Sequence, residues 1–228
     1  MPFEIVFALF PNLTQLDFTG PFEVFQRMPD VRIRLASRQG GLLRADSGLL
    51  FAELTPLSDV AGCDLICVPG GYGVAAALRD AEFVAHVRRL GQSARYITSV
   101  CTGSLLLAAA GLLEGKRATC HWAWRELLAE SGVQVESARV VRDGNCITGG
   151  GVTAGIDFAL AVVAEIAGAE VAQGIQLSME YAPQPPFDAG SPQSAPPAVL
   201  ERTRASALLL LDERRAALHA AIATRIRG

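Results

Sequence analysis

The chain has 228 residues, and 50% of them are hydrophobic, which is enough to bury the core of one large domain. Its net charge is −3 and its Lys and Arg residues are scattered, so we expect neither nucleic acid nor a membrane surface as a partner. No segment has the apolar length of a membrane span, and the first ten residues lack the features of a signal peptide. Because the five cysteines form an odd, irregular set, we expect a cytoplasmic protein without a disulfide framework.

The first hundred residues alternate patterns typical of strands with patterns typical of helices. Strands are expected at residues 3–10, 31–37, 64–68 and 96–100, with an edge hairpin at residues 42–54 that is broken by Asp46-Ser47-Gly48. Helices are expected up to Gln26, with Pro21 in the first turn, and over residues 74–90 as one or two segments. This alternation predicts an α/β fold, in which a mostly parallel sheet is covered on both faces and the active site lies at the carboxyl ends of its strands.

The second half of the chain continues this alternation and then changes in composition. Further elements are expected as helices from Ser104 and at residues 121–131, 152–167 and 170–181, a strand at 133–135 and a hairpin around Asp143-Gly144-Asn145. Residues 182–197 are rich in proline, and residues 199–227 return to a helical composition. We therefore divide the chain into a catalytic domain, residues 1–190, and a Pro-rich linker with a C-terminal helix, residues 191–228. That helix packs either on its own domain or across a dimer, and the sequence favours neither.

Cys101 stands where the strand at residues 96–100 should stop and a Leu/Ala-rich helix should start. A thiol in this turn would face the unpaired amides and the positive dipole end of the helix, which stabilise a thiolate. The arrangement resembles the strand-turn-helix elbow of hydrolases. The alternative is a buried cysteine that acts as a small hydrophobic residue. We favour a reactive nucleophile, because the turn signals of Cys101-Thr102-Gly103 coincide with the end of the strand.

Asp17 is the best candidate for a proton donor and acceptor beside the thiol. Its neighbours Leu16 and Phe18 are apolar, and partial desolvation would raise the pKa of the carboxyl. The equally supported alternative is a helix-capping aspartate without a chemical role. The amides of Gly70 and Gly71, together with the Thr102 amide, are expected to form an anion-stabilising pocket, although a tight turn alone would also explain the glycines.

Other candidate groups carry weaker expectations. Gly149 to Gly151 open a helix that starts at Val152, and their amides either form a turn or face a reacting anion. His121 is expected to be structural, because the helix after Thr102 should separate it from Cys101. Cys63 and Cys67 have neither the spacing nor the partners of a metal site, so no metal is expected. None of the Gly-rich turns matches a dinucleotide or phosphate loop.

The motifs together resemble those of the DJ-1/PfpI superfamily over nearly the whole chain. They are Asp17 to Pro21, Val68 to Gly71 and the elbow Ser99 to Ser104. Within the superfamily the chain is most similar to the isocyanide hydratases, judged by Leu16 to Pro21, Thr98 to Ser104, Val140 to Asn145 and Tyr181 to Phe187. The resemblance implies a flavodoxin-like α/β sandwich and a homodimer that needs no cofactor.

The resemblance also implies a reaction and a set of site residues. Cys101 would attack the terminal carbon of an isocyanide, and Asp17 would act as general acid and base. A thioimidate would form, and water would convert it into an N-substituted formamide. The expected substrate-binding residues are Gly70, Gly71, Thr102, Gly150 and Val152. Superfamily members that act as hydrolases place a histidine directly after the nucleophile, and Thr102 stands there in this chain.

Two non-enzymatic functions compete with this hypothesis. Similar motifs occur in the amino-terminal domains of AraC-type transcription regulators, where the cysteine binds or senses a ligand. The chain after Pro197 is too short for the two helix-turn-helix units of such regulators, so we do not expect direct DNA binding. A ligand-binding domain or a redox sensor, in which Cys101 is oxidised, remains as the alternative.

Overall fold

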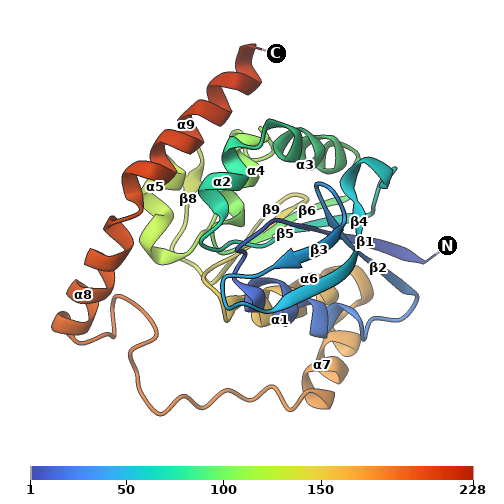
Figure 1. Cartoon of the computed structure of the whole chain (residues 1–228). Coiled ribbons are helices and arrows are strands. Elements are labelled where there is room, and N and C mark those ends of the chain that lie inside the picture. Colours follow the sequence, from blue (N-terminus) through green and yellow to red (C-terminus); the bar gives the residue numbers. More distant parts are fainter. Residues whose placement is uncertain (1, 228) are drawn as a thin grey trace.

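The computed structural model describes residues 2–227 and shows an eight-stranded sheet with helices on both faces (Figure 1). The sheet has the order β3-β4-β2-β1-β5-β6-β10-β9. Its strands are β1 (Phe3–Leu9), β2 (Val31–Ser37), β3 (Gly41–Arg44), β4 (Leu50–Pro56), β5 (Leu65–Val68), β6 (Tyr96–Val100), β9 (Val140–Asp143) and β10 (Cys146–Gly149). Only the pairs β3–β4 and β9–β10 are antiparallel. The predicted α/β sandwich with a mostly parallel sheet is confirmed.

Helices cover both faces of the sheet. The helices of residues 2–227 are α1 (Gln15–Phe25), α2 (Val74–Arg79), α3 (Ala81–Ser93), α4 (Gly103–Ala109), α5 (Arg125–Ala129), α6 (Ala154–Ala167), α7 (Ala169–Ser178), α8 (Pro197–Leu208) and α9 (Leu211–Arg227). Figure 1 shows α2, α3 and α4 on one side, and α1, α6 and α7 on the other. The short strands β7 (Arg117–Ala118) and β8 (Gln134–Val135) form a separate parallel pair. Residues 1 and 228, at the outer ends of the two expected segments, lie outside the described residues.

An aromatic cluster fixes α1 against the sheet and so places the residues of its first turns. The ring of Phe7 on β1 packs edge-on against Phe18 of α1, with 5.1 Å between their centroids. Phe25 at the end of α1 packs in the same way against Phe158 of α6, at 6.1 Å. All four rings are buried. Because edge-to-face pairs add to the free energy gained by burying the rings, α1 is held at both ends. Asp17 precedes Phe18 on this helix and is buried with it.

Three helix boundaries differ from those expected. The first helix starts at Gln15, so Pro21 lies in its interior. Proline removes one helical hydrogen bond. The ring of Pro21 packs against Gly155 of α6, where a Cβ would lie 3.0 Å from Pro21 Cδ. The expected helix over residues 121–131 is instead a 3-10 turn, Trp122–Trp124, followed by the five-residue α5. The long helix expected from Val152 begins at Ala154, because Val152 has a φ of 34°.

The C-terminal segment contains two helices where one was expected. The first, α8, has no buried residue, whereas α9 packs against α2 and α4 of the same chain. Figure 1 shows α9 running past the ends of α5 and α2. The face of α9 that turns inward carries Arg214, Ala217, Leu218 and Ala221. This face contacts its own chain. Within residues 2–227, no helix combines the length and the apolar character that crossing a bilayer requires.

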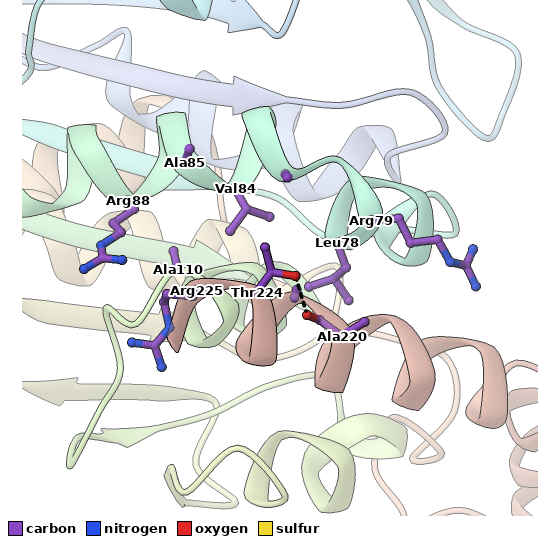
Figure 2. A pocket seen from close by; sticks show the side chains of 11 residues that line it. Leu78, Arg79, Val84, Ala85, Arg88, Ala110, Ala220, Thr224 and Arg225 are labelled. Carbon is purple, nitrogen blue, oxygen red and sulfur yellow. Dashed lines mark hydrogen bonds between the residues drawn. The ribbon is translucent and has the colours of Figure 1, made fainter. Parts of the chain in front are cut away.

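A hollow of about 340 Å³ lies where α9 meets α2 and α3 (Figure 2). Its apolar floor includes Leu78 and Val84, and arginines surround it. Arg79 pairs with Glu213 at 2.8 Å, and Arg225 pairs with Glu114 at 2.6 Å. Its lining includes no cysteine, and its one hydroxyl, that of Thr224, donates to a carbonyl of its own helix. The nucleophile predicted from the sequence is therefore not found here.

Leu218→Ala tests the packing of α9. Leu218 is fully buried, whereas Leu209, in the break between α8 and α9, is 85% exposed. Truncating a buried leucine leaves a cavity, so Leu218→Ala should lower the free energy of unfolding by about 2–5 kcal/mol. Leu209→Ala, which removes the same atoms from an exposed site, should change it by less than about 0.5 kcal/mol. Urea denaturation measures both, and equal effects of the two variants would contradict the packing.

Candidate active site

Cys101 occupies a strained turn between β6 and α4. Its φ is 58°, in the left-handed region that non-glycine residues rarely adopt. Its backbone N–H donates to the carbonyls of Gly149 and Gly150, at 3.1 and 2.8 Å. These bonds, from the end of the neighbouring strand β10, hold the turn in a conformation that costs about 1–3 kcal/mol. The structure thus places Cys101 in the strand-turn-helix position that the sequence predicts.

Glycines allow the loops after β5 and β6 to approach each other closely. A Cβ on Gly70 would overlap the backbone nitrogen and the hydroxyl of Thr102. A Cβ on Gly103 would overlap the carbonyl oxygen of Val68. Only glycine fits at such a close approach of backbone segments. The turn that carries Cys101 is therefore pressed against the end of β5.

Asp17 reaches this contact from the first turn of α1. Its side chain is fully buried, and its Oδ2 accepts a hydrogen bond from the Gly70 amide at 3.0 Å. Oδ1 has no partner with hydrogen-bond geometry among the described residues, although the Cys101 thiol lies close enough to lower the pKa of the carboxyl. Burial outweighs both contacts and raises the pKa of Asp17 to about 7. The Asp17 side chain does not cap its helix, which was one of the two roles considered from the sequence.

The thiol of Cys101 is held in its protonated form. Burial raises its pKa well above the usual value, and the nearby Asp17 raises it further. The amides of Val152 and Thr102 bond to the sulfur and lower the pKa by less. The expectation of a resting thiolate is therefore wrong. That expectation considered the amides at the start of the helix, which lower the pKa of the thiol. It left out burial and the neighbouring carboxyl, which raise it.

The amides of Gly70 and Gly71 do not have the role that the sequence suggested. The Gly70 amide is bonded to Asp17, and the Gly71 amide donates to Thr102 Oγ1 at 3.0 Å. Both are therefore occupied and orient neighbouring groups instead of facing a reacting anion. The amides that reach the sulfur belong to Thr102 and Val152. Only one of the three amides assigned to the anion pocket, that of Thr102, is thus found beside the sulfur.

A cavity of about 270 Å³ opens next to the sulfur. Its wall includes Cys101, Thr102, Val152, Gly71, Trp124 and Arg214. Three of the five expected substrate-binding residues, Gly71, Thr102 and Val152, therefore line it. Gly70 and Gly150 are not part of its lining: Gly70 binds Asp17, and the Gly150 carbonyl accepts from Cys101. The structure brings the nucleophile to a space large enough for a small molecule.

His121 lines the same cavity, and this corrects an expectation. The sequence suggested that the helix after Thr102 separates His121 from Cys101. That helix, α4, has only seven residues, and the chain then returns beside β10, where the Thr119 amide donates to Thr148 Oγ1 at 2.8 Å. His121 Nδ1 accepts from the Ala123 amide at 3.3 Å, so the proton of the neutral ring lies on Nε2. Burial and the nearby charges of Arg214 and Arg125 lower its pKa to about 4.

Arg214 of α9 is a cavity residue that the sequence analysis missed. It is only 4% exposed, and its guanidinium lies 4.0 Å from the ring centroid of Trp124. Its Nη2 donates to the Gly71 carbonyl at 3.2 Å. A signal did exist, because Arg214 lies on the same face of the helix as Leu218 and Ala221. An arginine on the apolar face of a helix is unusual and indicates a buried role.

A metal centre is not supported by the part of the chain that the structure describes. Within residues 2–227, no three His, Cys, Asp or Glu side chains are grouped so that they could hold an ion. Cys63 and Cys67 are both free thiols. Burial raises the pKa of each to about 12, which disfavours the thiolate that binds a metal.

Several known proteins are similar to this chain in sequence. An isonitrile hydratase of Pseudomonas putida is 50% identical over 204 residues, which are 90% of each chain. The HTH-type transcriptional regulator CdhR of Pseudomonas aeruginosa is 31% identical over 182 residues, which are 77% of this chain and 53% of the regulator.

Solved structures of the same fold also match. A THiJ/PfpI family protein from Pseudomonas syringae superposes with a TM-score of 0.92 at 38% identity, over 96% of this chain and 91% of that one. Drosophila melanogaster DJ-1beta superposes with a TM-score of 0.72 at 23% identity, over 79% of this chain and 98% of that one, which supports the fold alone. The model of the DJ-1/PfpI family matches residues 4–165, well over half of the chain. The chain therefore belongs to the DJ-1/PfpI family.

Proposed function

We propose that this protein is an isocyanide hydratase, which converts an isocyanide and water into an N-substituted formamide. The observation that carries the proposal is the buried pair of Asp17 and Cys101, in which Cys101 lines a small cavity and Asp17 lies behind it. Its carboxyl exchanges a proton near pH 7, next to a thiol that is still protonated. The similarity to the Pseudomonas putida isonitrile hydratase, which extends over 90% of both chains, supports the same function.

In the first step, the S–H group of Cys101 adds to the terminal carbon of the isocyanide. Asp17 in its carboxylate form takes the thiol proton as the sulfur attacks and then delivers it to the same carbon. The carbon gains one bond to sulfur and one to hydrogen, and the product is a thioimidate, R–N=CH–S. The amides of Thr102 and Val152 stabilise the negative charge on sulfur while the proton is in transit.

In the second step, water attacks the thioimidate carbon. Asp17 accepts a proton from the water and delivers it to the nitrogen, which gives a tetrahedral R–NH–CH(OH)–S group and leaves Asp17 as a carboxylate. Collapse of this group breaks the carbon–sulfur bond and releases R–NH–CHO. The hydroxyl proton passes through Asp17 to the departing sulfur, so Cys101 returns to its thiol form. The buried position of Asp17, which keeps its pKa near 7, lets one carboxyl act alternately as base and acid.

The proposal extends to the context in which the protein acts. We propose a homodimer in the cytoplasm that needs no cofactor, as the family resemblance and the odd set of five cysteines imply. The proposed catalytic domain, residues 1–190, would share its cavity with the segment 191–228, because Arg214 of α9 lines the wall beside Cys101.

A ligand-binding or redox-sensing domain is the second candidate. The similarity to the regulator CdhR favours it, although this chain corresponds to only about half of that protein. The raised pKa of Cys101 argues against a peroxide sensor, because the thiolate is the form that peroxides oxidise. Turnover of an isocyanide separates the two candidates.

Cys101→Ala should abolish formamide production. With a panel of alkyl and aryl isocyanides, loss of the nucleophile should lower kcat/KM by at least about 10³-fold. Cys63→Ala, at a half-buried thiol before β5, should retain most of the activity. Formamide is followed by chromatography or NMR. Appreciable turnover by Cys101→Ala would sink the mechanism, and no turnover by the wild type would favour the ligand-binding alternative.

Asp17→Asn should separate catalysis from the reactivity of the thiol. Since the carboxylate form starts the reaction and its pKa is about 7, wild-type kcat/KM should rise with pH through about 7 to a plateau. Asp17→Asn should lower kcat/KM by about 10²–10⁴-fold and remove this dependence. Peroxide oxidation of Cys101 should largely survive the substitution. A pH profile that is unchanged in Asp17→Asn would assign the titration to another group.

The same substitution should stabilise the protein at alkaline pH. Folding raises the pKa of Asp17 from 3.8 to about 7, so the folded state binds more protons in this interval. The free energy of unfolding therefore falls as pH rises from about 4 to 7, and the full penalty persists above pH 7. Asn carries no charge, so Asp17→Asn should be more stable than the wild type by about 1–3 kcal/mol at pH 8, with a smaller gain at pH 5. Urea denaturation at both pH values tests this, and a variant less stable at pH 8 would refute it.

A further inference from the structure

Arg214 brings a charge into the cavity that the proposed mechanism does not use. The residue is 4% exposed and lines the wall together with Cys101. Burial lowers the pKa of its guanidinium, yet arginine stays charged under such conditions. A buried charge costs free energy unless a counter-ion or several hydrogen bonds compensate it.

Arg214 takes part in no ion pair among the described residues. The charge of its neighbour on α9, Glu213, acts on it without direct contact, and Glu213 itself pairs with Arg79. The other ionisable side chains nearest the sulfur do not compensate it: Cys101 is held as a thiol and His121 is neutral. Asp17 is absent from the cavity lining and is bound to the Gly70 amide. The cavity wall thus presents a cation without a resident anion.

Part of the guanidinium remains free to bind a ligand. Of its five N–H donors, one makes a recorded hydrogen bond within residues 2–227, from Nη2 to the Gly71 carbonyl. Among the described residues, Nε of Arg125 and Nε of Arg225 are fully buried and have no hydrogen-bond partner. The other nitrogens of Arg214 are not fully buried in this way. They therefore retain access to the cavity. Trp124 stacks on the face of the guanidinium, which leaves its edge for an in-plane partner.

The rest of the wall limits the size and character of a ligand. Val152, Leu210 and the ring of Trp124 are apolar, and α8 adds the hydroxyls of Thr203 and Ser206. About 270 Å³ is available, which suits a small molecule with a short apolar part. A planar carboxylate matches the edge of a guanidinium through two parallel hydrogen bonds, and charge-assisted bonds of this kind are strong in an enclosed site.

We propose that the substrate is an isocyanide that carries a carboxylate, with the carboxylate bound by Arg214 while the isocyanide carbon faces Cys101. This inference rests on the proposed hydratase function and specifies its substrate class. The alternative is that Arg214 is purely structural and only holds α9 to the Gly71 carbonyl and to Trp124. In that case Arg214→Met should lower kcat/KM equally for charged and neutral substrates.

The test compares isocyanoacetate with its methyl ester, which differ only in the charged group. Wild-type kcat/KM should favour the acid by about 10–100-fold, mainly through KM, since a hydrogen-bonded charge contributes on this scale. Arg214→Met should abolish the preference, and Arg214→Lys should restore part of it. Arg88→Met, at an exposed arginine of the hollow in Figure 2, serves as the control and should leave both substrates unchanged. Equal kcat/KM for acid and ester in the wild type would overturn the proposal, as would an equal loss for both in Arg214→Met.

A binding measurement keeps the inference distinct from the proposed function. Calorimetry on Cys101→Ala, which cannot form the thioimidate, measures binding of the product-like N-formylglycine and of its methyl ester. The acid should bind at least about tenfold tighter, and this difference should vanish in Cys101→Ala/Arg214→Met. Arg214-dependent binding without turnover of any isocyanide would support the carboxylate site and refute the hydratase. Turnover of the neutral ester without tighter binding of the acid would refute the carboxylate site and leave the hydratase in place.

Discussion

The hydrogen bond from the Gly70 amide to Asp17 Oδ2 holds a carboxyl in the apolar interior, and the arrangement around Cys101 depends on it. Gly70 also lies so close to the loop after β6 that a Cβ on it would overlap Thr102. The same contact lets the Gly71 amide bond to the Thr102 hydroxyl. One close approach of two loops thus positions the acid, the turn that carries the thiol and one wall of the cavity.

Burial acts in opposite directions on the acidic and basic groups of the site. It raises the pKa of Asp17 and Cys101 and lowers the pKa of His121, because a low-dielectric environment disfavours the charged form of each. The thiol and the imidazole are therefore neutral near pH 7, while the carboxyl titrates there. In the proposed mechanism the carboxyl takes the thiol proton and returns it to the isocyanide carbon, and a carboxyl that titrates near pH 7 beside a protonated thiol suits these two transfers. A resting thiolate would instead favour oxidation of the sulfur.

Short-range patterns predicted several features of the site from the sequence. The end of a strand, the turn residues and the start of a helix are neighbours in the chain, so the position of Cys101 could be read directly. The roles of the Gly70 and Gly71 amides could not, because their acceptors lie 53 and 31 residues away in the sequence. Asp17 was recognised as a candidate, but only its contact with Gly70 distinguishes it from a helix cap.

By itself, the sequence determined the alternation of strands and helices, the mostly parallel sheet, and the residues that could supply a nucleophile and an acid. These follow from hydrophobic periodicity and turn chemistry, which act over a few residues. Only the tertiary structure decided that Cys101 rests as a thiol, that His121 enters the cavity and that Arg214 joins it from the last helix. Protonation states and cavity walls depend on burial and on charges from distant segments, and these are defined only once the chain has folded.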